Sequence, residues 1–117
     1  STVAWLLFVL GAAHIAHGAI KFKTPLTDAV RAGFVGRFGM PEARRTAFWF
    51  VMFGPLLMLA GHVSIHAAAA SDVQLVRIVG AYLLGLTIVG VLALPKSPFL
   101  AGLAVAILLL ASSYGLI

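Results

Sequence analysis

Four histidines are the side chains of this chain best suited to chemistry. His14 and His17 lie three positions apart. His62 and His66 lie four positions apart. Both spacings place two imidazoles on the same face of a helix. Imidazole binds haem iron and divalent transition metals, and it can act as a general acid or base near pH 7. The chain contains no cysteine, so such a site would use nitrogen and oxygen ligands.

Two other polar residues, Arg77 and Thr87, lie in the strongly apolar stretch 73–94. An ionisable residue inside a membrane helix is by default a candidate functional residue. Arg77 has two interpretations. Its side chain snorkels toward the outer surface, or it forms an outer polar pocket with Asp72 and the nearby histidines that receives an anionic head group.

The elements that carry these side chains are expected to lie in a membrane. The chain has 117 residues, of which 62% are hydrophobic and only 9% charged. Soluble domains are typically about 45–50% apolar and about 25% charged. The composition therefore excludes a water-soluble globule, and the length predicts a single transmembrane domain over residues 1–117.

Four segments are long and apolar enough to cross a membrane as helices, since a crossing helix needs about 20 mostly apolar residues. They are residues 2–20, 47–67, 73–94 and 99–117, all approximately bounded. A capping box of Ser71 and Gln74 is expected to start the third of them. The predicted fold is all-α: an integral membrane four-helix bundle.

The connection between the first two spans predicts a short amphipathic helix at the membrane interface, over about residues 25–38. Thr24 followed by Pro25 is a typical helix start, and Gly39 is expected to end the helix. Apolar residues recur every four positions between them: Leu26, Val30, Phe34 and Phe38.

The basic residues indicate the orientation of the bundle. Residues 21–45 contain six of the eight Lys and Arg residues, and Lys96 lies in the turn between the last two spans. The connection 68–72 contains none. The positive-inside rule then places residues 21–45 in the cytoplasm and both termini outside. The bilayer is thus the expected partner, and nucleic acid is not, because no separate basic domain exists.

The histidine pairs are expected at different depths. His14 lies about 9 Å from the cytoplasmic end of its helix, and His62 lies about 22 Å from the cytoplasmic start of its own. Imidazole–metal bonds are only about 2.0–2.1 Å long, so one ion is not expected to bind all four histidines of one protomer. Two sites are expected instead. The candidates for the inner site are His14, His17 and Thr87, where an inward-facing His14 can bond to Thr87. The candidates for the outer site are His62, His66 and Arg77.

These sites have two further interpretations. Haem or a divalent metal could use His14, His17, His62 and His66, although bis-histidine haem would require a second protomer or another ligand, because the last two spans contain no histidine. The other interpretation is structural, with the imidazoles forming hydrogen bonds between helices.

Catalysis is not favoured. The three carboxylates, Asp28, Glu42 and Asp72, lie at or outside the ends of predicted helices. The chain has no phosphate-binding glycine loop and no H-E-x-x-H motif. Only a histidine acting as acid or base, or an arginine binding an anion, remains for an enzymatic role.

Small residues repeat at i, i+4 in three of the predicted spans. The pairs are Ala12/Ala16, Ala81/Gly85, Gly102/Ala106 and Ala111/Gly115. Such pairs let helix backbones approach closely in lipid. They predict a homo-oligomer or membership of a larger membrane complex.

Three short motifs are spread along the chain: G-x-x-H-x-x-x-G at 11–18, A-F-W-F-x-x-x-G at 47–54 and P-x-S-x-F at 95–99. Together they resemble a family of small, uncharacterised four-helix bacterial membrane proteins. The resemblance implies the bacterial inner membrane, and therefore periplasmic termini. It also implies that His14 is the histidine of the motif, whereas His17, His62 and His66 lie outside it. The family brings no established activity.

Two functions are therefore expected as alternatives. The first is a non-catalytic accessory or self-associating subunit of a membrane assembly. The second is histidine-based binding of haem, a metal or a lipophilic small molecule, in a small redox or enzyme unit.

Overall fold

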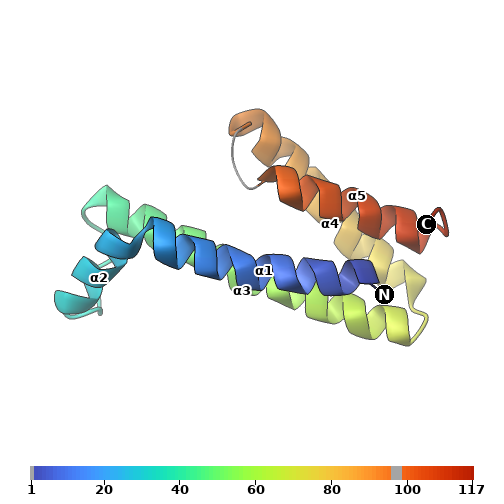
Figure 1. The fold of residues 1–117 in the computed structure, drawn as a ribbon, viewed down its shortest axis with the longest axis horizontal. Coiled ribbons are helices and arrows are strands. Elements are labelled where there is room, and N and C mark those ends of the chain that lie inside the picture. The colour runs from blue at the N-terminus through green and yellow to red at the C-terminus, as the bar shows by residue number, and fades with distance from the viewer. Residues whose placement is uncertain (1, 96–98) are drawn as a thin grey trace.

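The computed structural model describes residues 2–95 and 99–117, which form five helices and no strand (Figure 1). The helices are α1 (Thr2–Lys21), α2 (Lys23–Arg31), α3 (Glu42–Ala69), α4 (Val73–Ala93) and α5 (Phe99–Ser113). Three of these, α1, α3 and α4, are long and apolar enough to cross a membrane. α5 is equally apolar but has 15 residues, about 22 Å of helix. The predicted turn with Lys96 falls largely on residues 96–98, outside the described residues.

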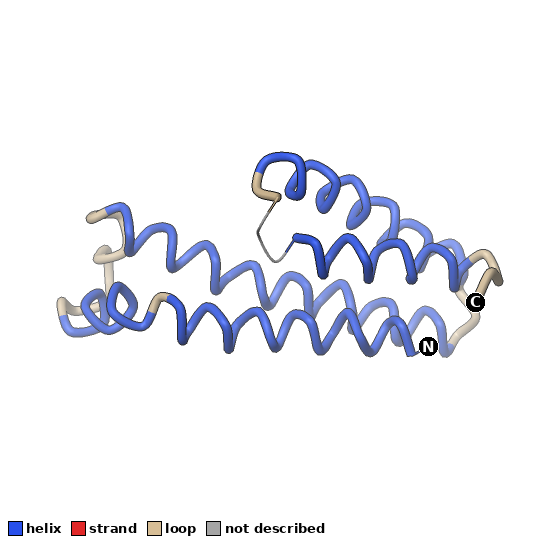
Figure 2. The backbone as a smooth tube through the Cα atoms, turned by 45° about the horizontal axis from the view of Figure 1, so that its top comes forward, coloured by secondary structure: helices blue, strands red, loops and turns tan. Residues whose placement is uncertain are grey.

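The helices form two antiparallel hairpins, α1 with α3 and α4 with α5 (Figures 1 and 2). Both termini and the α3–α4 connection lie at one end of the molecule, and α2 lies at the other. The α4–α5 hairpin covers the part of the α1–α3 hairpin nearest the termini. It leaves the part nearest α2 uncovered.

Glycines bring α1 and α3 together. A Cβ atom on Gly11 would lie 2.6 Å from the Met58 amide nitrogen and 2.7 Å from the Gly54 carbonyl oxygen. Those atoms belong to the backbone and cannot move aside as a side chain would. Gly61 faces the backbone of Phe8 in the same way. The α1–α3 hairpin is therefore held by direct backbone approach, as small residues permit in apolar surroundings.

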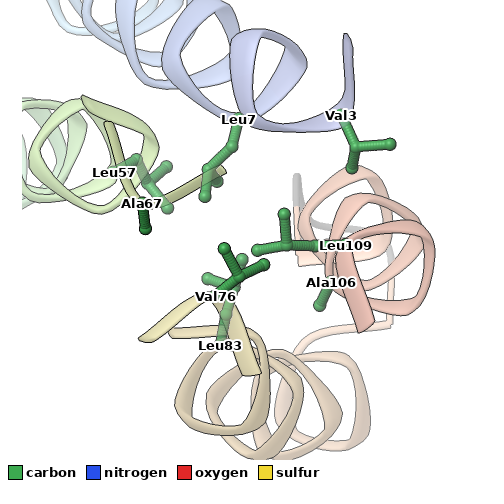
Figure 3. Packing of buried hydrophobic residues seen from close by; sticks show 8 residues of the cluster. All are labelled: Val3, Leu7, Leu57, Ala67, Val76, Leu83, Ala106 and Leu109. Carbon is green, nitrogen blue, oxygen red and sulfur yellow. The ribbon is translucent and has the colours of Figure 1, made fainter. Parts of the chain in front are cut away.

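The core lies at the end that carries the termini. Leu7 and Leu109 are completely buried, and they lie in a cluster with side chains from α1, α3, α4 and α5 (Figure 3). The cluster comprises Val3, Leu7, Leu57, Ala67, Val76, Leu83, Ala106 and Leu109. Because both helices of each hairpin contribute to the cluster, this end joins the two hairpins.

The helix predicted over about residues 25–38 is shorter in the structure. α2 ends at Arg31 rather than near residue 38. Gly33 (φ +117°) forms a left-handed C-terminal cap, in which its amide binds the Val30 carbonyl and the Phe34 amide binds the Ala29 carbonyl. Gly33, and not Gly39, ends the helix. The apolar period of four continues to Phe38 although the helix does not. Phe34 and Phe38 are apolar for another reason: Phe34 packs against Phe38, and Phe38 packs against Phe48 of α3.

The predicted capping box at the start of α4 is replaced by another cap. Asp72 is the N-cap residue, and its carboxylate accepts a hydrogen bond from the Leu75 amide at 3.1 Å. Ser71 instead ends α3: it has φ +58°, its amide binds the Ala68 carbonyl, and the Asp72 amide binds the Ala67 carbonyl. The connection is too short for Ser71 both to end α3 and to cap the start of α4.

Helix ends also differ from the predicted spans. α5 ends at Ser113 in another left-handed cap: Gly115 has φ +73°, and the Leu116 amide donates a hydrogen bond to the Ala111 carbonyl. α3 begins at Glu42 and ends at Ala69, beyond both bounds of its predicted span.

Candidate functional site

A cavity of about 1100 Å³ lies between the two hairpins, where the cover by α4 and α5 ends. Its walls come from the second half of α1, the first half of α3, the end of α4 and the start of α5. The lining residues are Leu10, His14, His17, Lys21, Phe22, Thr46, Trp49, Phe50, Phe53, Leu57, Thr87, Ala93, Leu94, Pro95, Phe99 and Gly102. The walls are therefore mostly aromatic and aliphatic, with five polar side chains among them.

His14 contacts two residues of α3: its ring meets the Phe53 ring edge-on, with centroids 5.6 Å apart, and it binds Phe50 in two ways. Its ring stacks on the Phe50 ring, with centroids 4.1 Å apart and an angle of 18° between the planes. Its Nε2 donates a hydrogen bond of 2.8 Å to the Phe50 carbonyl oxygen. A carbonyl only accepts, so Nε2 carries the hydrogen and the lone pair of the neutral ring is on Nδ1. In this arrangement Nε2 is not a metal or haem ligand.

Thr87 lines the same cavity as His14 and His17 but does not bind His14. Its hydroxyl, in a side chain only 2% exposed, donates to the Leu83 carbonyl at 2.8 Å. The predicted His14–Thr87 bond is therefore wrong. A threonine hydroxyl in an apolar helix finds the carbonyl one turn earlier more readily than a partner on another helix.

The cavity has a polar rim at the end of α1. His17 is exposed, and its ring lies 5.9 Å from that of Phe50. The Lys21 ammonium lies 5.5 Å from the centre of the Phe22 ring and 5.7 Å from that of Phe50, both within cation–π range. In the sequence, Lys21 is marked only as a topology signal, and Phe50 is marked only by its place in the A-F-W-F motif.

At the opposite end of α3, His62 and His66 contact each other. Their Nε2 atoms are 3.1 Å apart, and both side chains are exposed. They line a hollow of about 430 Å³ with Asp72 and Leu75.

Arg77 does not complete this outer site, which corrects the predicted trio. Its Nη2 donates to the Ser113 carbonyl at 3.1 Å, and its guanidinium lies 3.9 Å from the centre of the Tyr114 ring. Two residues along a helix rotate a side chain by about 200°, so Arg77 faces α5 while Leu75 faces the histidines. Its Nε is buried and has no hydrogen-bond partner among the described residues.

The four histidines thus form two pairs at opposite ends of the α1–α3 hairpin. Within residues 2–95 and 99–117, no three or more His, Cys, Asp or Glu side chains are grouped so as to hold a metal ion. The pair on α1 borders the large cavity, and the pair on α3 borders the small hollow.

These features define a class: a small all-helical protein with three helices long and apolar enough to cross a membrane, and an apolar cavity with a polar rim. Within this class, the chain belongs to a family of unknown function (DUF6463), whose model matches residues 1–115. No curated protein and no solved structure matches the chain. The match agrees with the expectation of an uncharacterised family and assigns no activity.

Proposed function

We propose that the protein binds an amphiphilic, lipophilic molecule in the cavity between its hairpins, without transforming it chemically. The observation that carries this proposal is the lining: aromatic and aliphatic walls, with Lys21 and the exposed His17 at the rim by the end of α1. Ligand pockets are typically about 300–1,000 Å³, mostly apolar, with a few placed polar groups. A volume of about 1100 Å³ accommodates a molecule with a long apolar part.

The rim determines the orientation of the ligand. Lys21 contributes a positive charge, and the exposed His17 contributes a hydrogen-bonding imidazole one turn before it. A polar or anionic head group is stabilised there, while the apolar part lies between Phe50, Phe53 and Phe99. The ligand class is therefore an amphiphile with a single polar end.

The same proposal places the protein in the bacterial inner membrane, with α1, α3, α4 and α5 as four spans. Residues 21–45 lie in the cytoplasm because they carry most of the basic charge. Lys21 then lies at the cytoplasmic head-group level, which lets the ligand exchange with the inner leaflet.

Extraction of ligand from the purified protein tests this function. The protein is purified in detergent, the bound molecules are extracted, and their amounts are measured by mass spectrometry. Ala93→Trp fills the cavity from the end of α4, whereas Ala101→Trp adds the same ring at an exposed position outside the lining. We expect one enriched amphiphile in the native protein and in Ala101→Trp, and its loss in Ala93→Trp. An extract that matches bulk membrane lipid in all three would overturn the proposal.

A second candidate function is self-association, or assembly as an accessory subunit, through α4. One observation favours it: Ala81 and Gly85 are exposed, and a Cβ atom on Gly85 would meet nothing within 4 Å. By contrast, Gly102 and Ala106 are buried within the protomer. Crosslinking in native membranes tests this candidate, with Gly85→Ile expected to abolish a dimer band and Ala104→Ile, exposed on α5, expected to retain it.

A further inference from the structure

The pair formed by His62 and His66 has a geometry that goes beyond a helix-stabilising contact. The two Nε2 atoms are 3.1 Å apart. Two neutral imidazoles at this distance share one hydrogen, so one ring donates from Nε2 and the other presents its Nε2 lone pair. The two nitrogens therefore converge on one small region beside the last turns of α3.

This separation is close to the one that a metal ion imposes on two ligands. With metal–nitrogen bonds of about 2.0–2.1 Å, two tetrahedral ligands lie about 3.3 Å apart. Two neighbouring ligands of a square-planar ion lie about 2.9 Å apart at the same bond length. The observed 3.1 Å falls between these values. When the shared hydrogen moves from Nε2 to Nδ1 of its own ring, both Nε2 lone pairs are free, and an ion can bind both rings after only small side-chain rotations.

The surroundings of the pair suit a cation. Both histidines are exposed, so water and ions reach them. Residues 62–76 contain no Lys or Arg, and the Arg77 guanidinium is directed to Ser113 and Tyr114 of the chain end. Asp72 lines the same hollow and adds a negative charge, while one of its oxygens accepts the Leu75 amide hydrogen.

We propose that His62 and His66 form a bidentate, exchangeable site for a late first-row divalent cation at the C-terminal end of α3. Imidazole is a preferred ligand of copper, nickel and zinc, and affinity for a given site rises toward Cu²⁺. Structural zinc sites have four protein ligands. This site supplies two, so water or small anions complete the coordination and the ion exchanges readily. The site lies away from the cavity and does not depend on the function proposed for it.

Titration of the untagged full-length protein in detergent micelles tests the site. After treatment with a chelator, the protein is titrated with Cu²⁺, Ni²⁺ or Zn²⁺ by calorimetry, and with Mg²⁺ as a hard cation that prefers oxygen ligands. We expect one Cu²⁺ per chain, weaker binding of Zn²⁺, and no heat with Mg²⁺. Removal of a group that only forms a hydrogen bond to a metal ligand typically lowers metal affinity by about 10–100-fold. His62→Gln and His66→Gln, which each remove a ligand, should therefore weaken binding about tenfold or more.

The other histidine pair provides a matched control. His17→Gln changes an exposed imidazole on α1 and should leave the Cu²⁺ affinity unchanged. Electron paramagnetic resonance of bound Cu²⁺ should show coupling to two nitrogens in the native protein and to one in His66→Gln. Equal affinities of the native protein and His62→Gln, or a two-nitrogen signal that survives in His66→Gln, would overturn the proposal. An absence of Cu²⁺ binding to the folded native protein would do the same.

Discussion

The imidazole of His14 lies flat on the phenyl ring of Phe50 and donates a hydrogen bond to the carbonyl oxygen of that same residue. Phe50 of α3 thus holds His14 of α1 through two contacts, the ring stacking and the hydrogen bond. Phe50 also contacts the rings of His17 and Phe22 and the ammonium group of Lys21. It is therefore the side chain that organises the wall and rim of the cavity.

Replacement of His14 separates its structural contribution from its ring chemistry. His14→Leu loses the bond to the Phe50 carbonyl and should lower the free energy of unfolding by about 1 kcal/mol. His14→Gln keeps an N–H donor in nearly the same place and should lose less. Thermal unfolding in detergent, followed by circular dichroism, measures both. An unchanged melting temperature in His14→Leu would contradict a stabilising role for this bond.

The close approach of α1 and α3 predicts a strong dependence on side-chain size at Gly11. A larger residue there meets the backbone of Met58 and Gly54, so Gly11→Val should destabilise the protein by about 1–3 kcal/mol, as overpacking does. Gly85→Ala is the control, because nothing lies within 4 Å of its added Cβ. It should leave the unfolding transition unchanged or slightly raised. Equal effects of the two substitutions would show that the hairpin is not held by this contact.

The connection between α3 and α4 predicts a stabilising substitution. Ser71 has φ +58°, a left-handed conformation that costs a non-glycine residue roughly 1–2 kcal/mol. Ser71→Gly removes this cost but makes the unfolded chain more flexible, so a net gain below about 1 kcal/mol is expected. Asp72→Ala removes the cap of α4 and should cost about 1 kcal/mol. Chemical unfolding of both variants measures these changes, and a Ser71→Gly protein less stable than the native one would contradict the prediction.

Arg77 is expected to hold the end of α5 against α4. Its guanidinium binds the carbonyl of Ser113, the last residue of α5, and lies on the ring of Tyr114. A cation at a helix C-terminus also interacts favourably with the helix dipole, typically by about 0.3–1 kcal/mol. In Arg77→Leu, the amides of residues 110–116 should exchange hydrogen for deuterium faster, whereas those of α1 should not change. Unaltered exchange at 110–116 would exclude this role.

Accessibility to a membrane-impermeant thiol reagent tests the proposed orientation, because the chain has no cysteine of its own. A cysteine in place of Ser71 should react from the periplasmic side of intact cells, and one in place of Thr27 should react only after lysis. Reaction of Thr27→Cys alone in intact cells would reverse the topology.

The helical class of this protein, and the presence of helices long and apolar enough to cross a membrane, follow from its sequence alone. Long apolar stretches have no stable alternative to helix in lipid, because each backbone polar group needs a partner within the chain. The sequence also indicated that the two histidine pairs are separate, since helix rise converts residue number into depth. Helix ends were predicted less well. Gly33 and Gly115 mark the ends of α2 and α5, but the apolar pattern continues past both glycines. The periodicity of side chains does not show where the backbone takes a positive φ.

Only the tertiary structure decided which polar groups meet. The sequence places Arg77 near His62 and His66 along the chain, yet Arg77 binds Ser113, 36 residues away, because the α4–α5 contact offers it an unpaired carbonyl at a helix end. The partner of His14 is likewise a backbone carbonyl, at Phe50, and not the expected Thr87 hydroxyl. Each helix has many carbonyls, so no residue type marks the one that will accept such a bond. The cavity arises from the offset between the two hairpins, which depends on packing between helices and leaves no local pattern in the sequence.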